Sequence, residues 1–86
     1  MPVSLTAWLP PKAKHSYTIF VNDSAVPRSV MVMIRANGDY AKMKVKARKG
    51  FRVSQNDMQS GRAAGDAVLR QYGHNFNDIL KAAQGR

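Results

Sequence analysis

Asn37-Gly38 lies between two runs of strand-forming residues, at 30–36 and 39–48. Asn-Gly in this setting is the strongest short-range signal for a β-hairpin, because a type I′ turn requires positive φ at both central residues. The sequence therefore predicts a hairpin whose turn is centred on Asn37-Gly38 and in which Ala36 faces Asp39.

That register divides the hairpin into two faces. It pairs Ile34 with Ala41, Val32 with Met43 and Val30 with Val45. Because side chains alternate with period two along a strand, these residues share one apolar face. The opposite face carries the remaining side chains: Met31, Met33, Arg35, Tyr40, Lys42, Lys44, Lys46 and Arg48. A slip by one residue would bury lysines, so the register is expected to be firmly held.

The rest of the chain predicts an α+β fold in a single domain over 1–86. Its 86 residues suffice for one modest core but not for a deep substrate cavity. A small antiparallel sheet of three to four strands is expected, with strands at about 15–21, 28–36, 39–48 and 51–53. One or two C-terminal helices should follow and pack on this sheet, at about 55–72 and 77–84.

The longer predicted helix has recognisable ends. Ser54 to Asp57 resembles a capping box, with Asp in place of Glu, and Gly73 suits a left-handed C-terminal cap. Gly61 and Gly65 recur on the apolar side of the helix, which indicates a close approach to another backbone. We expect the helices to cover the apolar face of the hairpin.

Residues 1–14 predict an extended N-terminal arm or an edge strand. Apolar residues alternate over 3–9, and Pro10-Pro11 then interrupts any regular element. Trp8 in this segment is interpreted as a core residue, because a small domain needs large apolar side chains. The alternative is that Trp8 is an exposed contact residue.

The charge is large and unevenly placed. The chain has 14 Lys+Arg against 5 acids, a net charge of +9. Residues 28–52 hold eight basic residues and one acid, so this window carries +7 of that total. A charge this one-sided predicts a polyanionic partner: DNA first, RNA as a possibility, or a protein with an acidic surface.

The basic face of the hairpin is the predicted contact surface for nucleic acid. Lys42, Lys44 and Lys46 recur about 6.6 Å apart along a strand, close to twice the roughly 3.4 Å rise per nucleotide of one DNA strand. The predicted contact residues are Arg35, Tyr40, Lys42, Lys44, Lys46, Arg48, Lys49 and Arg52. The competing explanation is that lysines protect an edge strand from pairing with another sheet.

A second hypothesis is a protein-binding accessory factor, such as a corepressor or an inhibitor of a larger protein. Flexible thioethers on an exposed face suit an adaptable protein interface. The interface residues in this case would be Met31, Met33 and Trp8. Sheet edges or the last helix also allow a homodimer.

Two known architectures share features with this chain. Three antiparallel strands and a helix over residues 28–72, with basic charge on the sheet, resemble the sheet-reading DNA-binding domains of phage integrase arms and of plant ethylene-response factors. That resemblance implies a sheet that enters the major groove. From Phe51 onward, a short strand, a helix, Gly73 and another helix are similar to ribbon-helix-helix repressors.

Several classes of function lack the residues that they need. The chain has no cysteine and no glutamate, and His15 and His74 are far apart, so we expect no enzymatic activity, no metal and no cofactor. Absence of cysteine is typical of the cytoplasm, where we expect the protein. The longest apolar run, 30–34, is too short to span a bilayer, so no membrane association is expected.

Overall fold

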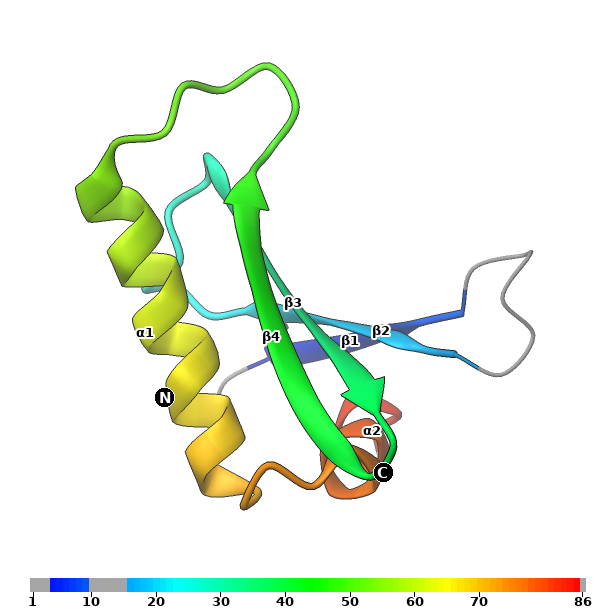
Figure 1. Ribbon diagram of the computed structural model, residues 1–86. Coiled ribbons are helices and arrows are strands. Elements are labelled where there is room, and N and C mark those ends of the chain that lie inside the picture. The colour runs from blue at the N-terminus through cyan, green and yellow to red at the C-terminus, as the bar shows by residue number, and fades with distance from the viewer. Residues whose placement is uncertain (1–3, 10–15, 86) are drawn as a thin grey trace.

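A four-stranded antiparallel sheet followed by two helices makes up the fold (Figure 1). The computed structural model describes residues 4–9 and 16–85. The Pro10-Pro11 break and the predicted strand start at His15 lie outside these residues. In order across the sheet, the strands are β1 (Ser4–Trp8), β2 (Thr18–Asn22), β3 (Val30–Asn37) and β4 (Tyr40–Ala47). The helices are α1 (Gln55–Gln71) and α2 (Phe76–Ala83), so the predicted α+β class is confirmed.

The β3–β4 turn differs from the prediction. Asn37 pairs with Tyr40, so Gly38 and Asp39 form the two-residue loop. Gly38 has a φ of 65°, whereas the φ of Asp39 is not positive. Positive φ at the first central residue alone is the mark of a type II′ turn, in which that position is taken by glycine. The predicted type I′ turn and its pairing of Ala36 with Asp39 are therefore wrong.

The corrected register still preserves both faces of the hairpin. Ile34 pairs with Met43, Val32 with Val45 and Val30 with Ala47, a shift of two residues along β4. Because side chains alternate with period two, an even shift keeps every side chain on its predicted face. Apolar periodicity therefore cannot separate the two registers, and the turn conformation decides between them.

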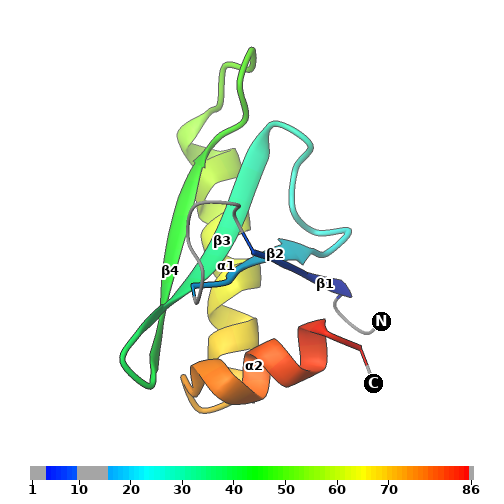
Figure 2. The same cartoon turned by 90° about the vertical axis from the view of Figure 1, so that its right-hand side faces the viewer.

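Helix α1 covers the apolar face of β3 and β4 (Figure 2). The Ser54 hydroxyl accepts a hydrogen bond from the Asp57 amide at 3.1 Å, and Gly73 adopts a φ of 59° beyond the C-terminus, as predicted for both ends. A Cβ at Gly61 would lie 2.6 Å from Val30 Cγ1, and a Cβ at Gly65 would lie 2.9 Å from Val32 Cγ1. The predicted close approach of the helix to the sheet is thus confirmed.

Helix α2 closes the other end of the same core against β1 and β2. Its Phe76 and Ile79 are buried together with Ile19 and Val21 of β2. The chain between the helices fastens to the edge of β4 near the turn: the Ala41 amide donates to the His74 carbonyl at 2.8 Å. Apolar side chains of both strand pairs therefore share one core.

The predicted strand at 51–53 does not form, and residues 51–54 are an irregular link to α1. Gly50, with a φ of 89°, turns the chain away from β4, and the Phe51 amide bonds back to the Arg48 carbonyl at 3.0 Å. Val53 packs partly buried against the core, while Phe51 is exposed. The strand that the ribbon-helix-helix comparison requires is therefore absent from this segment.

Candidate nucleic-acid interface

One face of the sheet is left open. In the part of the chain that the structure describes, α1 and α2 pack on the face that carries Ile19, Val32 and Ile34, and no helix packs on the other (Figure 2). We call this second side the open face. It presents the alternate side chains of all four strands.

Strand register places the open-face side chains in rows that run across the sheet. One row consists of Trp8, Thr18, Arg35 and Lys42, each paired with the next on the neighbouring strand. The next row consists of Thr6, Phe20, Met33 and Lys44. Met31 and Lys46 pair in the row after that. Each row therefore ends in a lysine on β4, and its apolar members lie on the strands before it.

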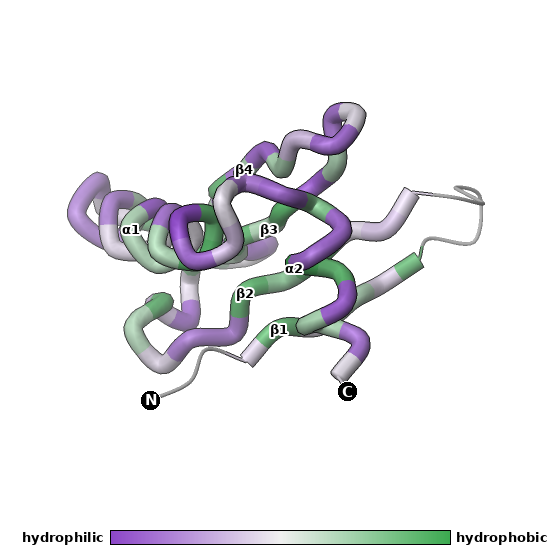
Figure 3. Tube along the Cα trace, turned by 90° about the horizontal axis from the view of Figure 1, so that it is seen from below, coloured by the Kyte–Doolittle hydropathy of each residue, from purple (hydrophilic) through white to green (hydrophobic). Residues whose placement is uncertain are grey.

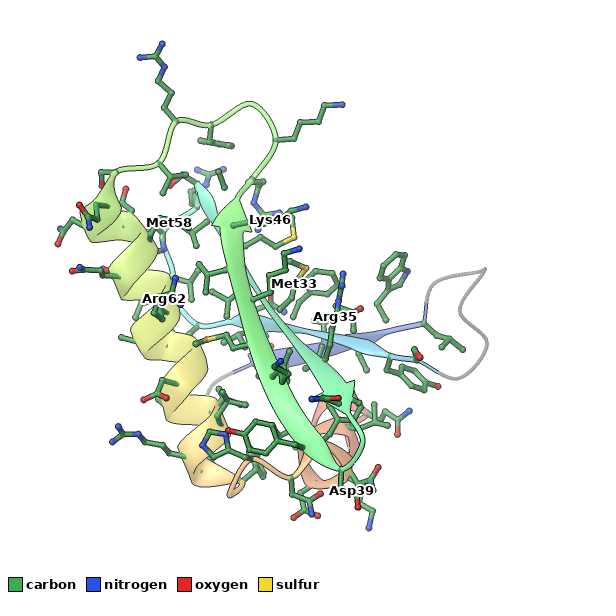
Figure 4. All side chains as sticks on the ribbon, viewed as in Figure 1. Met33, Arg35, Asp39, Lys46, Met58 and Arg62 are labelled. Atoms are coloured by element: carbon green, nitrogen blue, oxygen red, sulfur yellow. The ribbon has the colours of Figure 1, made fainter. Side chains whose placement is uncertain are left out.

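Among the described residues, the cations of the strands on this face form no ion pair. Arg35, Lys42, Lys44 and Lys46 are all exposed. The four strands contain no Asp or Glu, and among the described residues the ion pair formed is that of Asp66 with Arg70 on α1, 2.9 Å apart. Arg35 and Lys46 both extend from the sheet in Figure 4. Their charges are therefore available to a polyanion.

Arg48 follows the last residue of β4, and a hydrogen bond holds its side chain in place. Its Nε donates a hydrogen bond to the Arg28 carbonyl at 3.1 Å, which leaves the terminal guanidinium nitrogens free of that contact. Arg48 also lines a shallow groove on the open face with Thr6, Phe20, Asn22 and Met31. The Asn22 amide nitrogen donates to the Thr6 hydroxyl at 2.6 Å, so two of the residues that line this groove are hydrogen-bonded to each other.

An apolar patch lies beside the cations and consists of Trp8, Phe20 and Met31. The ring centroids of Trp8 and Phe20 are 6.2 Å apart with planes tilted by 42°. Trp8 is 48 % exposed, so its interpretation as a core residue is wrong. The reason is its place in the fold: it ends an edge strand and its side chain points to the face that no helix covers.

Met33 lies on this face but is buried, with only 4 % of it exposed, as is Thr18 in the neighbouring row. Met33 was expected to lie exposed on this face together with Met31. The face is as predicted, but the exposure is wrong. Met33 sits in the middle of its row, between Phe20 on β2 and Lys44 on β4 (Figure 4). Neighbours on two sides can bury a central side chain, and lysine stems commonly lie along apolar surface in this way.

Three of the predicted contact residues lie apart from the cations of the open face. Tyr40, at the turn end of β4, stacks on His74 with centroids 5.1 Å apart and planes 6° from parallel. Lys49 and Arg52 are exposed in the link beyond the end of β4. The structure thus gathers Arg35, Lys42, Lys44, Lys46 and Arg48 on one surface and leaves the other three at its two ends.

Sequence reasoning missed the contribution of β2 and, apart from Trp8, that of β1. Phe20, Thr6 and Asn22 stand on the open face, yet none was a predicted contact residue. The signal was present in the alternation of 17–21, which sets Phe20 opposite to Ile19 and Val21. In Figure 3, hydrophilic and hydrophobic residues alternate along β4, whereas most of β2 and β3 is hydrophobic.

Other kinds of site find little support in the described residues. They hold no cluster of three or more His, Asp or Glu side chains that would suit a metal ion. None of their helices has the length and apolar character needed to cross a membrane. Comparison of the chain with protein-family models, with curated proteins and with solved structures gave no match.

Proposed function

We propose that this protein binds nucleic acid, DNA in the first instance, through the open face of its sheet. The observation that carries the proposal is the gathering of five cations on one uncovered face whose strands contain no acid: Arg35, Lys42, Lys44, Lys46 and Arg48. The proposed role of the protein is that of a regulatory or accessory factor without enzymatic activity. A cytoplasmic location stays a prediction that rests on the absence of cysteine.

The physical basis is counterion release. Phosphates of nucleic acid hold condensed cations, and each lysine or arginine that replaces one makes binding more favourable at low salt. The net charge of +9 adds long-range attraction, which raises the association rate. Arginine can also contact phosphate with two donors at once, so Arg35 and Arg48 would add orientation to the attraction.

The experiment compares two charge-matched variants. Lys42/Lys44/Lys46→Ala removes three cations from the open face, and Arg62/Arg70/Lys81→Ala removes three exposed cations from the helices, so each lowers the net charge from +9 to +6. Binding of labelled duplex DNA, single-stranded DNA and RNA would be measured by anisotropy between about 50 and 200 mM salt. The two sets separate a specific surface from net charge.

We expect the lysine variant to lose most of its affinity and the helix variant to lose little. The slope of log affinity against log salt should decrease in magnitude by about 2 to 3 for the lysine variant, at roughly 0.7 to 0.9 per lost phosphate contact. Equal losses in the two variants would contradict the open face as the contact surface. No binding by the wild type at low salt would contradict nucleic-acid binding itself.

A protein partner with an acidic surface is the second candidate, and the exposed apolar residues favour it. Trp8 and Leu9 are 48 % and 38 % exposed, at the end of β1. Aromatic side chains of this kind anchor many protein interfaces. This candidate predicts capture of one defined protein that persists at high salt and is lost on substitution of Trp8.

A further inference from the structure

We infer that the open face takes a single strand of nucleic acid, with unpaired bases on the apolar patch and phosphates along β4. The inference rests on the proposed function and narrows its ligand. In the rows of the open face, β1 to β3 supply the apolar side chains Trp8, Phe20 and Met31, which reach the surface, and β4 supplies Lys42, Lys44 and Lys46.

The two kinds of side chain lie on different strands of the open face. Phe20 on β2 and Lys44 on β4 lie two strand spacings apart with β3 between them, which is about 10 Å at roughly 4.8 Å per spacing. A single strand has the same division, because its charged backbone lies on one side and its bases turn to the other. A ligand laid along β4 would therefore bring its bases over the apolar patch.

Exposed aromatic rings distinguish single strands from duplexes. In a duplex the flat faces of the bases are hidden in the stack, so an indole has nothing to lie against. In a single strand these faces are free, and stacking on aromatic side chains is the usual mode of recognition. Trp8 has about half of its surface free and leans against Phe20, so it offers a ring that is both accessible and supported.

The groove beside Met31 adds polar groups at the other end of the patch. Phe20 forms one wall, and the Asn22 amide and the Arg48 guanidinium stand around it. An amide can bond to the edge of a base, and a guanidinium can stack on a base or bind phosphate. An acidic protein would use the cations but has no need of this combination of ring, amide and guanidinium.

The test uses four probes with the full chain: a mixed-sequence single-stranded oligonucleotide, its duplex, an abasic phosphodiester of the same length, and poly-glutamate. Binding would be followed by anisotropy and by the emission of Trp8, which is the single tryptophan. We expect the single strand to bind at least about 10-fold more tightly than the duplex or the abasic chain, because stacking of one base alone contributes an affinity gain of about this size. The single strand should also quench Trp8 emission.

Two variants locate the effect. Trp8→Ala should weaken single-strand binding by about 5- to 150-fold, the range for loss of one base stack, and should leave duplex and abasic binding within about 2-fold. Phe51→Ala removes another half-exposed aromatic, in the link after β4, and should change neither. Since Trp8 lies outside the core, its replacement should not unfold the protein, which circular dichroism would confirm.

The outcomes separate this inference from the proposed function. If the duplex or the abasic chain binds as tightly as the single strand and Trp8 emission does not change, the single-strand inference is overturned. Nucleic-acid binding itself would still stand. Poly-glutamate bound as tightly as the oligonucleotide, with the same quenching, would overturn the inference in favour of an acidic protein. No salt-dependent binding of any nucleic acid would overturn both proposals.

Discussion

The space that a side chain at Gly65 would need is occupied by Met43: an added Cβ there would run into the Met43 Sδ. The same Cβ would lie 2.9 Å from Cγ1 of the buried Val32. Met43 itself comes from the strand that carries the open-face lysines. The packing of α1 and the placement of those lysines therefore depend on the same strand.

Replacement of Gly65 by alanine should destabilise the protein, although alanine is normally the better helix former. Overpacking costs about 1 to 3 kcal/mol, against a helix-propensity gain of about 1 kcal/mol, so a net loss of up to about 2 kcal/mol is expected. Urea denaturation would measure it. Ala63→Gly, at an exposed position of the same helix, should lose only about 1 kcal/mol by propensity.

A double variant makes this prediction specific. If Gly65→Ala acts through Met43, then combining it with Met43→Ala should cost less than the sum of the two single losses, by about 0.5 kcal/mol or more. Strict additivity of the two losses would show that Met43 is not the obstacle.

The turn offers a test of the hairpin register. Gly38→Ala places a side chain at a φ of 65°, which should cost about 1 to 2 kcal/mol. Asn37→Ala should change stability by less than about 0.5 kcal/mol, since Asn37 is exposed and lies outside the two-residue loop. A type I′ turn centred on Asn37-Gly38 would instead make both substitutions costly. Thermal denaturation of the two variants distinguishes these registers.

The Ser54 cap should be worth a measurable amount. Ser54→Ala removes the acceptor of the Asp57 amide bond, and loss of such a cap typically costs about 1 kcal/mol. Ser60 is the matched control, because its hydroxyl only donates back to the Asn56 carbonyl within the helix, at 3.2 Å. Ser60→Ala should be neutral or slightly stabilising. Equal losses for the two serines in denaturant titrations would contradict the assigned cap.

Arg48 should not be replaceable by lysine without loss. Arg48→Lys keeps the charge but loses the Nε hydrogen bond to the Arg28 carbonyl, which orients the guanidinium. We expect about a 3- to 10-fold weaker affinity for the oligonucleotide, with an unchanged salt slope. Lys46→Arg, on the neighbouring open-face position of β4, should bind within about 2-fold of the wild type. An Arg48→Lys variant that binds like the wild type would show that only its charge matters.

Local patterns in the sequence predicted most of the elements. The alternation along 30–48 placed the right side chains on each face of the hairpin, because period two survives a shift of register by two residues. Ser54 and Gly73 marked the ends of α1, since caps depend on residues next to them in the chain. Gly61 and Gly65 predicted that the helix packs closely on the sheet. These features are local, and a sequence displays them directly.

The composition of the open face was decided by tertiary structure. Trp8 and Phe20 are twelve positions apart, and only the antiparallel pairing of β1 with β2 brings their rings together. Met33 is buried because β2 and β4 flank β3 on both sides, which the hairpin alone does not reveal. The sequence by itself determined that one side of the β3–β4 hairpin is basic. The order of four strands, and the packing of both helices on the other side, determined that this basic side is open and carries aromatic rings beside its lysines.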